Sequence, residues 1–184
     1  QTGGLKVLRF GNENAKNADL KVKYLGGTMD GSRFSLEWRD CGFRREISWH
    51  LTGKHQAMNA GAAALAANAV GVSPETASDA LCKGVQIPGM RMRVQERDGV
   101  TWINDAYNAN PESMKAGIEW LHEASAGSVK KDARVFVILG DMLEMGEAGP
   151  PAHEDILRLA SSLMPGAVIM PVGPIMMKSA EKIR

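Results

Sequence analysis

The sequence has little cysteine, almost no net charge and no long apolar run. Its 184 residues include two cysteines, Cys41 and Cys82, and no C-x-x-C pair, which disfavours both a disulfide scaffold and a thiolate zinc site. The 22 basic and 21 acidic side chains give a formal net charge of +1, so no general surface for nucleic acid is indicated. The apolar runs are far shorter than the ~20 residues of a membrane-spanning helix.

Several familiar motifs are missing as well. Gly53-Lys54-His55 is not a Walker A loop, because no glycine stands five positions before Gly53 and histidine replaces serine or threonine. The absence of G-x-G-x-x-G and G-x-S-x-G argues against a dinucleotide fingerprint and a nucleophile elbow. His153-Glu154 lacks the second histidine of H-E-x-x-H, so it is not a zinc-protease motif.

The composition is that of a folded protein with two regions of different charge. Hydrophobic residues make up 44% and charged residues 23%, which excludes intrinsic disorder. Residues 1–88 carry a net charge of +3, whereas residues 89–184 carry −2. Between these regions, residues 83–89 contain two glycines and a proline, as a connector does. We therefore expect two domains, residues 1–88 and residues 89–184.

The first domain is expected to contain short strands followed by two helices. Alternating runs that end at Gly, Asn or Asp are typical of strands and hairpins. These runs are residues 5–10, 20–25, 33–38 and 43–51. The alanine-rich residues 54–70 predict a helix that ends at Gly71. Ser73-Pro74-Glu75 predicts the start of a second helix, with serine as its N-cap and proline in its first turn.

The second domain alternates between expected strands and helices. The strands are residues 100–103, 134–140 and 167–170, and the helices are residues 110–124, 151–163 and 174–183. Residues 134–140 form a nearly continuous apolar run, which is typical of a central parallel strand covered on both faces. This alternation predicts an α/β fold with a parallel sheet and right-handed crossovers.

Polar side chains follow the expected strands at their carboxyl ends, where ligands bind in such sheets. Asp105 lies just past residues 100–103, which we expect to be buried, and its carboxylate can accept hydrogen bonds from a ribose or hold a cation. Asn108 and Asn110 can donate and accept hydrogen bonds beside it. The structural alternatives are that Asn110 caps a helix and that Asn108 shapes the turn.

The loop after residues 134–140 is the second candidate. It holds three acids, Asp141, Glu144 and Glu147, between flanking glycines. Such a loop can meet an ammonium group or a magnesium ion, and it can equally be a solvated acidic loop.

Basic and polar residues near the connector and at the start of the first helix are further candidates. Arg91 and Arg93 follow the connector, and an arginine there can bind phosphate oxygens with two hydrogen bonds, the alternative being a surface charge. His55 and Asn59 are four residues apart at the start of the alanine-rich helix and share one face. Nucleotide atoms bind at helix N-termini, although a histidine in this place is more often a surface residue.

Four segments, in order along the chain, resemble those of one enzyme family. They are residues 7–11 (VLRFG), 53–60 (GKHQAMNA), 104–114 (NDAYNANPESM) and 139–147 (LGDMLEMGE), the last followed by His153. This pattern is similar to that of the Mur ligases, ATP-dependent enzymes that build the peptidoglycan stem peptide. The Tyr-Asn-Ala-Asn-Pro run carries most of the specificity, and the resemblance spans nearly the whole chain.

The resemblance implies roles for individual residues. By it, His55 and Asn59 lie at the adenine, with Gln56 where the family usually has asparagine. It places Arg91 or Arg93 at the ATP phosphates. Asp105 would bind the ribose. Tyr107, Asn108 and Asn110 would line the side of the nucleotide and the incoming dipeptide. Asp141 and Glu144 would lie on the substrate side, in a loop that faces the cleft between the domains. It assigns no catalytic residue and no metal ligand to this chain.

The resemblance also implies an architecture and a reaction. Residues 1–88 would be the end of a central ATPase domain, and residues 89–184 an incomplete Rossmann-like C-terminal domain. ATP would phosphorylate the carboxylate of a UDP-N-acetylmuramoyl-tripeptide, and the amine of D-alanyl-D-alanine would then displace phosphate, with Mg²⁺ screening the negative charge. The enzyme is expected to be a cytoplasmic monomer that binds neither nucleic acid nor a membrane.

Two alternatives stay open at this point. A folylpolyglutamate synthase-like ligase shares the overall architecture, but the Tyr-Asn-Ala-Asn-Pro run argues against it. A non-catalytic nucleotide-binding or partner-binding α/β module is the alternative from another class of protein.

The 184-residue chain alone is expected neither to hydrolyse ATP nor to ligate. The family's P-loop, which supplies backbone donors and a lysine to the phosphates, would lie before residue 1. ADP release is the measurement, with the full-length enzyme as positive control, and turnover by the chain alone would contradict the expectation.

Overall fold

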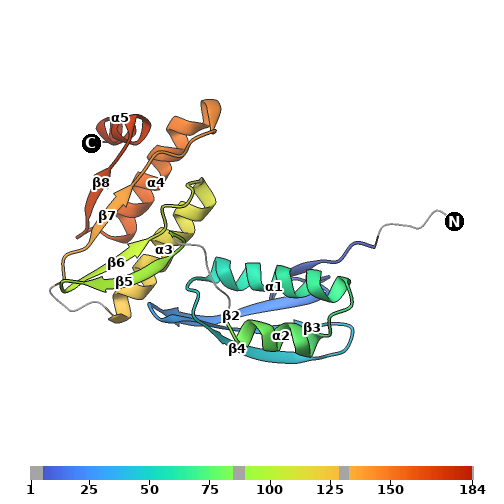
Figure 1. The fold of residues 1–184 in the computed structure, drawn as a ribbon. Coiled ribbons are helices and arrows are strands. Elements are labelled where there is room, and N and C mark those ends of the chain that lie inside the picture. Colours follow the sequence, from blue (N-terminus) through green and yellow to red (C-terminus); the bar gives the residue numbers. More distant parts are fainter. Residues whose placement is uncertain (1–5, 85–89, 129–132, 184) are drawn as a thin grey trace. The chain divides into compact units, whose positions relative to one another are not determined.

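The computed structural model describes residues 6–84, 90–128 and 133–183 (Figure 1). The chain divides into two compact units, residues 1–87 and residues 88–184. Most of the connector expected at residues 83–89 lies outside the described residues.

A four-stranded sheet forms the base of the first unit. Its strands are β1 (Phe10–Asn12), β2 (Leu20–Thr28), β3 (Gly31–Trp38) and β4 (Arg44–Trp49), in the order β1-β2-β3-β4. β1 is parallel to β2, and the other pairs are antiparallel. The strands expected at residues 20–25, 33–38 and 43–51 are confirmed.

The strand expected at residues 5–10 was misplaced, because β1 begins only at Phe10. The chain first meets β2 at Arg9, whose carbonyl oxygen accepts hydrogen bonds from the N–H groups of Asp19 and Leu20 at 2.7 and 3.2 Å. The Arg9 N–H in turn donates to Asp19 Oδ2 at 2.7 Å. Pairing with β2 therefore starts at Phe10 and continues to Asn12.

Helix α1 (Lys54–Ala69) packs closely against the sheet because its contact face consists of small residues. The buried residues recur at helical spacing and are Ala57, Ala60, Gly61, Ala64 and Leu65. A Cβ atom at Gly61 would lie 2.3 Å from Cγ2 of Val22 on β2. Glycine at this position therefore sets the distance between α1 and β2.

Helix α2 (Pro74–Cys82) begins as the sequence predicts. Ser73 is its N-cap, and the Ser73 Oγ accepts a hydrogen bond from the Thr76 N–H at 3.2 Å. Gly71 and Gly84 follow the two helices with φ of +96° and +84°, the left-handed conformation that ends helices.

The core of the first unit lies between the sheet and these helices. Its fully buried side chains include Leu20, Val22, Phe34, Leu36 and Ile47. Alternate residues of β4 face away from the core, and these residues, Arg44, Glu46 and Ser48, are exposed. The sheet therefore has one apolar face and one polar face, as antiparallel sheets commonly do.

Within its described residues, the second unit contains four strands and three α-helices. In chain order they are β5 (Arg93–Arg97), β6 (Val100–Asn104), α3 (Pro111–Ser128), β7 (Phe136–Leu139), the 3-10 turn η1 (Gly146–Ala148), α4 (Gly149–Leu163), β8 (Val168–Pro171) and α5 (Pro174–Ile183). β7 and β8 are parallel and are connected through α4, so the expected α/β class is confirmed. One core joins α3, α4, α5 and the β7–β8 sheet, with Ile118, Val137, Ile156 and Met176 among its buried residues.

The expectation that residues 100–103 form a buried strand of the parallel sheet was wrong. β6 pairs antiparallel with β5, with Arg97 opposite Val100 across a two-residue turn. The turn residues Asp98 and Gly99 both have positive φ, 53° and 75°, which suits the right-handed twist of a hairpin. Four of the five β6 residues are exposed, because in the described structure only β5 flanks the strand.

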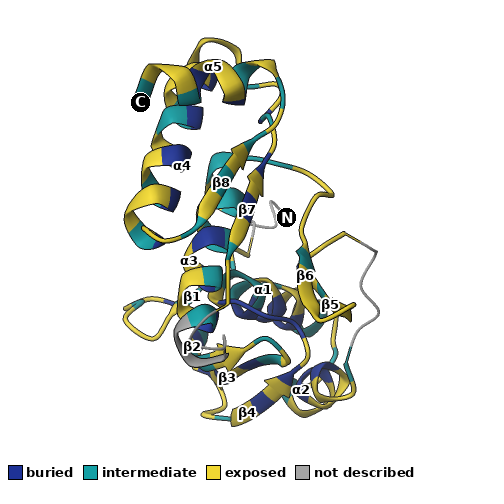
Figure 2. Ribbon diagram, turned by 90° about the vertical axis from the view of Figure 1, so that its left-hand side faces the viewer, coloured by how far each residue is buried: buried dark blue, intermediate teal, exposed yellow. Residues whose placement is uncertain are grey.

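The expectation that residues 134–140 are covered on both faces was also wrong. In β7, Val137 and Leu139 are buried, whereas Phe136 and Ile138 are 50% and 58% exposed (Figure 2). The buried residues point to the core that α3, α4 and α5 share, so these helices cover one face of the β7–β8 sheet. Within the described residues, the other face carries exposed apolar side chains.

No helix within residues 6–84, 90–128 and 133–183 has the length and apolarity to cross a membrane.

The close contact of α1 with β2 leads to a stability prediction. Gly61→Ala is expected to lower the free energy of unfolding by about 1–3 kcal/mol, because the new methyl group overlaps the stiff, buried side chain of Val22. Urea unfolding followed by circular dichroism measures the loss.

Gly117→Ala is the matched control, since its Cβ would lie 3.8 Å from Asp105 Oδ2, an ordinary contact, in the interior of α3. Alanine also favours the helix there. A loss in Gly61→Ala no larger than that in the control would contradict the close packing.

Candidate functional site

The segment between β6 and α3 is shaped by its own short polar side chains. Asn104 Oδ1 accepts a hydrogen bond from the Ala106 N–H at 3.1 Å. Asn108 Oδ1 accepts one from the Ala109 N–H at 2.9 Å. Asparagine replaces backbone partners in such turns, which explains why the segment is rich in asparagine. Asn108 therefore shapes the turn.

Asn110 is the N-cap of α3. Its Oδ1 accepts the Ser113 N–H at 2.8 Å, and the Ser113 Oγ accepts the Asn110 N–H at 3.2 Å. This reciprocal pair satisfies two backbone donors, as a capping box does. The helix-capping alternative for Asn110 is confirmed.

Asp105 binds backbone that precedes β5. Its Oδ1 accepts a hydrogen bond from the Met92 N–H at 2.9 Å. The Tyr107 N–H donates to the Met90 carbonyl oxygen at 3.0 Å. These two bonds fasten residues 90–92 to the segment after β6.

Arg91 lies between these two fastened residues, and its guanidinium carbon is 4.0 Å from the centre of the Tyr107 ring. The structure thus brings together three of the predicted site residues: Arg91, Asp105 and Tyr107. Arg93, the alternative to Arg91, is exposed on β5 opposite Asn104.

Asp141, at the end of β7, caps α5 from a distance in sequence. Pro174 has no N–H group, and the next two N–H groups, of Ile175 and Met176, donate to the two carboxylate oxygens of Asp141 at 3.3 and 2.7 Å. Gly173 has φ of +98°, and a Cβ there would lie 2.5 Å from Asp141 Cγ. Glycine at this position therefore leaves the space that the Asp141 carboxylate occupies.

His153 holds the same loop and was not singled out from spacing in the sequence. The ring is fully buried in α4, and its Nε2 accepts the Met142 N–H at 2.8 Å. The other ring nitrogen, Nδ1, therefore carries the proton and donates to the Gly149 carbonyl oxygen at 2.7 Å. Because Nε2 is an acceptor, its 3.9 Å separation from Asp141 Oδ1 is a contact and not an ion pair.

The acids of the β7 loop do not gather into a cluster. Asp141 is occupied at α5, whereas Glu144 and Glu147 are exposed, and Glu144 has φ of 62°. Across the three described stretches of the chain, no group of three or more His, Cys, Asp or Glu side chains is placed to hold a metal ion.

His55 and Asn59 belong to the first unit and lie in the first turns of α1. Asn59 is exposed, and its Nδ2 donates to Gln56 Oε1 at 3.4 Å. Gly53 is the N-cap of the helix, with φ of +95° and no side-chain hydrogen bond to the helix. The first two turns of α1 therefore carry the polar side chains of His55, Gln56 and Asn59.

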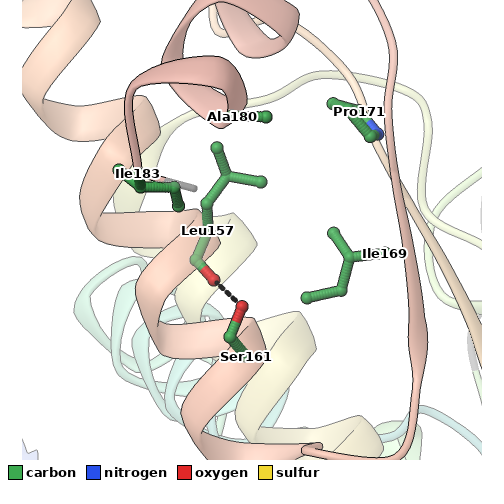
Figure 3. Close-up of a pocket in the computed structure, with 6 residues that line it drawn as sticks. All are labelled: Leu157, Ser161, Ile169, Pro171, Ala180 and Ile183. Atoms are coloured by element: carbon green, nitrogen blue, oxygen red, sulfur yellow. Dashed lines mark hydrogen bonds between the residues drawn. The ribbon is translucent and has the colours of Figure 1, made fainter.

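A cavity of about 260 Å³ lies elsewhere in the second unit, between α4, β8 and α5 (Figure 3). Its lining is mostly apolar and consists of Leu157, Ser161, Ile169, Pro171, Ala180 and Ile183. The one hydroxyl group, Ser161 Oγ, donates to the Leu157 carbonyl oxygen at 2.9 Å. Without a charged group, this cavity has no chemistry suited to phosphates.

Comparisons with known proteins identify the family of the chain. Residues 90–183 match the family model described as Mur ligase, glutamate ligase domain. The chain is similar to the UDP-N-acetylmuramoyl-tripeptide–D-alanyl-D-alanine ligase of Bacillus subtilis, with 36% identity over 154 residues, which are 83% of this chain and 30% of that protein. The Mycobacterium tuberculosis H37Rv enzyme of the same name is 40% identical over 136 residues, 71% of this chain and 25% of that protein.

A solved structure of an enzyme from this family has a similar fold. The crystal structure of MurF from Acinetobacter baumannii superposes with a TM-score of 0.75 and 26% identity, over 95% of this chain and 35% of that one. The chain thus spans about a third or less of the length of these relatives.

The buried histidine leads to a prediction about the β7 loop. His153→Ala is expected to lower the free energy of unfolding by about 1–3 kcal/mol, because it leaves the buried Met142 N–H without an acceptor. It is also expected to speed hydrogen exchange at that amide, which nuclear magnetic resonance measures directly.

His122→Ala is the matched control, because His122 is exposed on α3 in the same unit. Unchanged protection of the Met142 amide in His153→Ala would show that the bond does not hold the loop.

Proposed function

Because the chain belongs to the Mur ligase family, we propose that it is part of an ATP-dependent ligase that adds D-alanyl-D-alanine to a UDP-N-acetylmuramoyl-tripeptide. The similarity to two enzymes of that name, at 36% and 40% identity, is the observation that carries the proposal. Residues 1–88 would be the end of the central ATP-binding domain, and residues 89–184 part of the C-terminal domain. The enzyme would act in the cytoplasm as a monomer.

The proposed reaction forms an amide bond in two steps. A carboxylate oxygen of the tripeptide attacks the γ-phosphorus of ATP, which releases ADP and leaves an acyl phosphate. The amine nitrogen of D-alanyl-D-alanine then attacks the acyl carbon, phosphate leaves, and the nitrogen loses a proton. Mg²⁺ would screen the charge of the phosphates.

Arg91 would bind phosphate oxygens, for which the guanidinium fork is suited. Tyr107 lies directly beneath it, and both residues are exposed. Glu144 is the exposed acid of the β7 loop and is a candidate for contact with the ammonium group of the incoming dipeptide. Asp141 would orient this loop, since its two oxygens bind the first N–H groups of α5.

The polar residues around Arg91 would complete the nucleotide side. Asp105 would lie at the ribose, and Asn108 and Asn110 would offer their amide nitrogens, because their oxygens already bind backbone N–H groups. In the first unit, His55 and Asn59 would contact the adenine.

The acceptor decides between this proposal and the ligase alternative. The full-length enzyme is expected to release ADP and form product with the UDP-linked tripeptide and D-alanyl-D-alanine together, and to form none when glutamate replaces the dipeptide. Product formed with glutamate would favour a folylpolyglutamate synthase-like ligase. Nucleotide binding without turnover on any acceptor would favour a non-catalytic module.

A further inference from the structure

The backbone on both sides of Arg91 has an unusual conformation. Met90 and Met92 have φ of 65° and 45°, in the left-handed region that residues other than glycine seldom adopt. Such strain persists only where surrounding contacts enforce it, and it concentrates at functional sites. Residues 90–92 are therefore held in place by other parts of the unit.

Two hydrogen bonds, one from a carboxylate and one from a backbone N–H group, and one buried side chain hold this turn. Asp105 Oδ1 accepts the Met92 N–H at 2.9 Å, and the Met90 carbonyl oxygen accepts the Tyr107 N–H at 3.0 Å. The Met92 side chain is only 7% exposed. The two outer residues of the turn are thus anchored, and the side chain between them projects outward.

The outward side chain is that of Arg91, which is exposed and stacks on Tyr107. The 4.0 Å separation between its guanidinium carbon and the centre of the Tyr107 ring is that of a cation–π contact. A guanidinium has five N–H donors in a fixed fork, so an arginine held by such a contact can still bind a doubly accepting anion. A long side chain that is already held in place also loses less freedom when it binds.

We infer that Asp105 and Tyr107 are positioning residues for Arg91: the Asp105 carboxylate fixes the strained turn and the Tyr107 ring fixes the guanidinium, ready for a nucleotide phosphate. This inference rests on the proposed ATP-dependent function. It makes Arg91, and not Arg93, the phosphate-binding arginine. It also gives Asp105 a role that acts through Arg91.

The test measures kcat and KM for ATP in the full-length enzyme. Arg91→Ala is expected to lower kcat/KM for ATP about 10- to 100-fold, the effect of a lost charge-assisted contact. Tyr107→Leu removes the ring and is expected to cost about 2- to 5-fold, whereas Tyr107→Phe keeps the ring and restores the wild-type value.

A double-mutant cycle tests the role of Asp105. Asp105→Ala is expected to lower kcat/KM for ATP by a larger factor in the wild type than in the Arg91→Ala background, because the part of its effect that acts through Arg91 is already lost there. Equal fold losses in the two backgrounds would overturn the positioning role and leave Asp105 only its contact with the ribose. ATP binding measured by calorimetry gives the same cycle if turnover becomes too slow.

Phe136→Leu is the matched control, because Phe136 is an exposed ring 5.2 Å from the guanidinium carbon of Arg134 in the same unit. It is expected to leave the ATP kinetics unchanged. In the 184-residue chain, Tyr107→Leu is expected to abolish the upfield ring-current shift of the Arg91 Hδ protons, a readout independent of activity.

The outcomes separate the inference from the proposed function. If the unaltered full-length enzyme does not ligate, the proposed function fails. If it ligates but Tyr107→Leu matches the wild type, or if Arg93→Ala and not Arg91→Ala carries the loss, the positioning inference alone is overturned.

Discussion

The hydrogen bond between the Asp105 carboxylate and the Met92 N–H is the constraint on which the candidate site depends. It joins the end of β6 to the residues before β5 and, together with the bond from the Tyr107 N–H to the Met90 carbonyl oxygen, holds the left-handed conformation of Met90 and Met92. This turn and the Tyr107 ring together hold Arg91 in one orientation. The hydrogen bond from the Met92 N–H to the charged Asp105 carboxylate thus helps to fix the direction of the exposed Arg91 side chain.

The same device recurs at the end of β7. There the carboxylate of Asp141 binds the first N–H groups of α5, and His153 accepts the Met142 N–H beside it. Several polar side chains that the sequence indicated as ligand contacts, such as Asp105, Asn110 and Asp141, therefore bind backbone N–H groups of the protein itself. Arg91, Tyr107 and Glu144 are among the exposed groups that this scaffolding presents.

Local signals made much of the fold predictable. The alanine-rich run predicted α1, Gly71 predicted where it ends, and Ser73 predicted where α2 begins. Each of these signals acts within a few residues. Asp98-Gly99 was an equally local signal for the β5–β6 hairpin, but the expected parallel sheet obscured it. The candidate segment after β6 was found from the sequence, whereas the contacts of Asp105 and His153 were not, because their partners, Met92 and Met142, are backbone groups 13 and 11 residues away.

The cap supplied by Asp141 also has a consequence for the order in which the chain folds. Ser73 and Asn110 each accept the N–H group three residues further along the chain, so the caps of α2 and α3 can form while the rest of the chain is still unfolded. The carboxylate of Asp141 is 34 residues from Ile175, and reaching it requires closure of the loop that contains α4 and β8. Helix α5 therefore gains its first-turn stabilisation only after the parallel strand pair has assembled, which makes it a late-forming element.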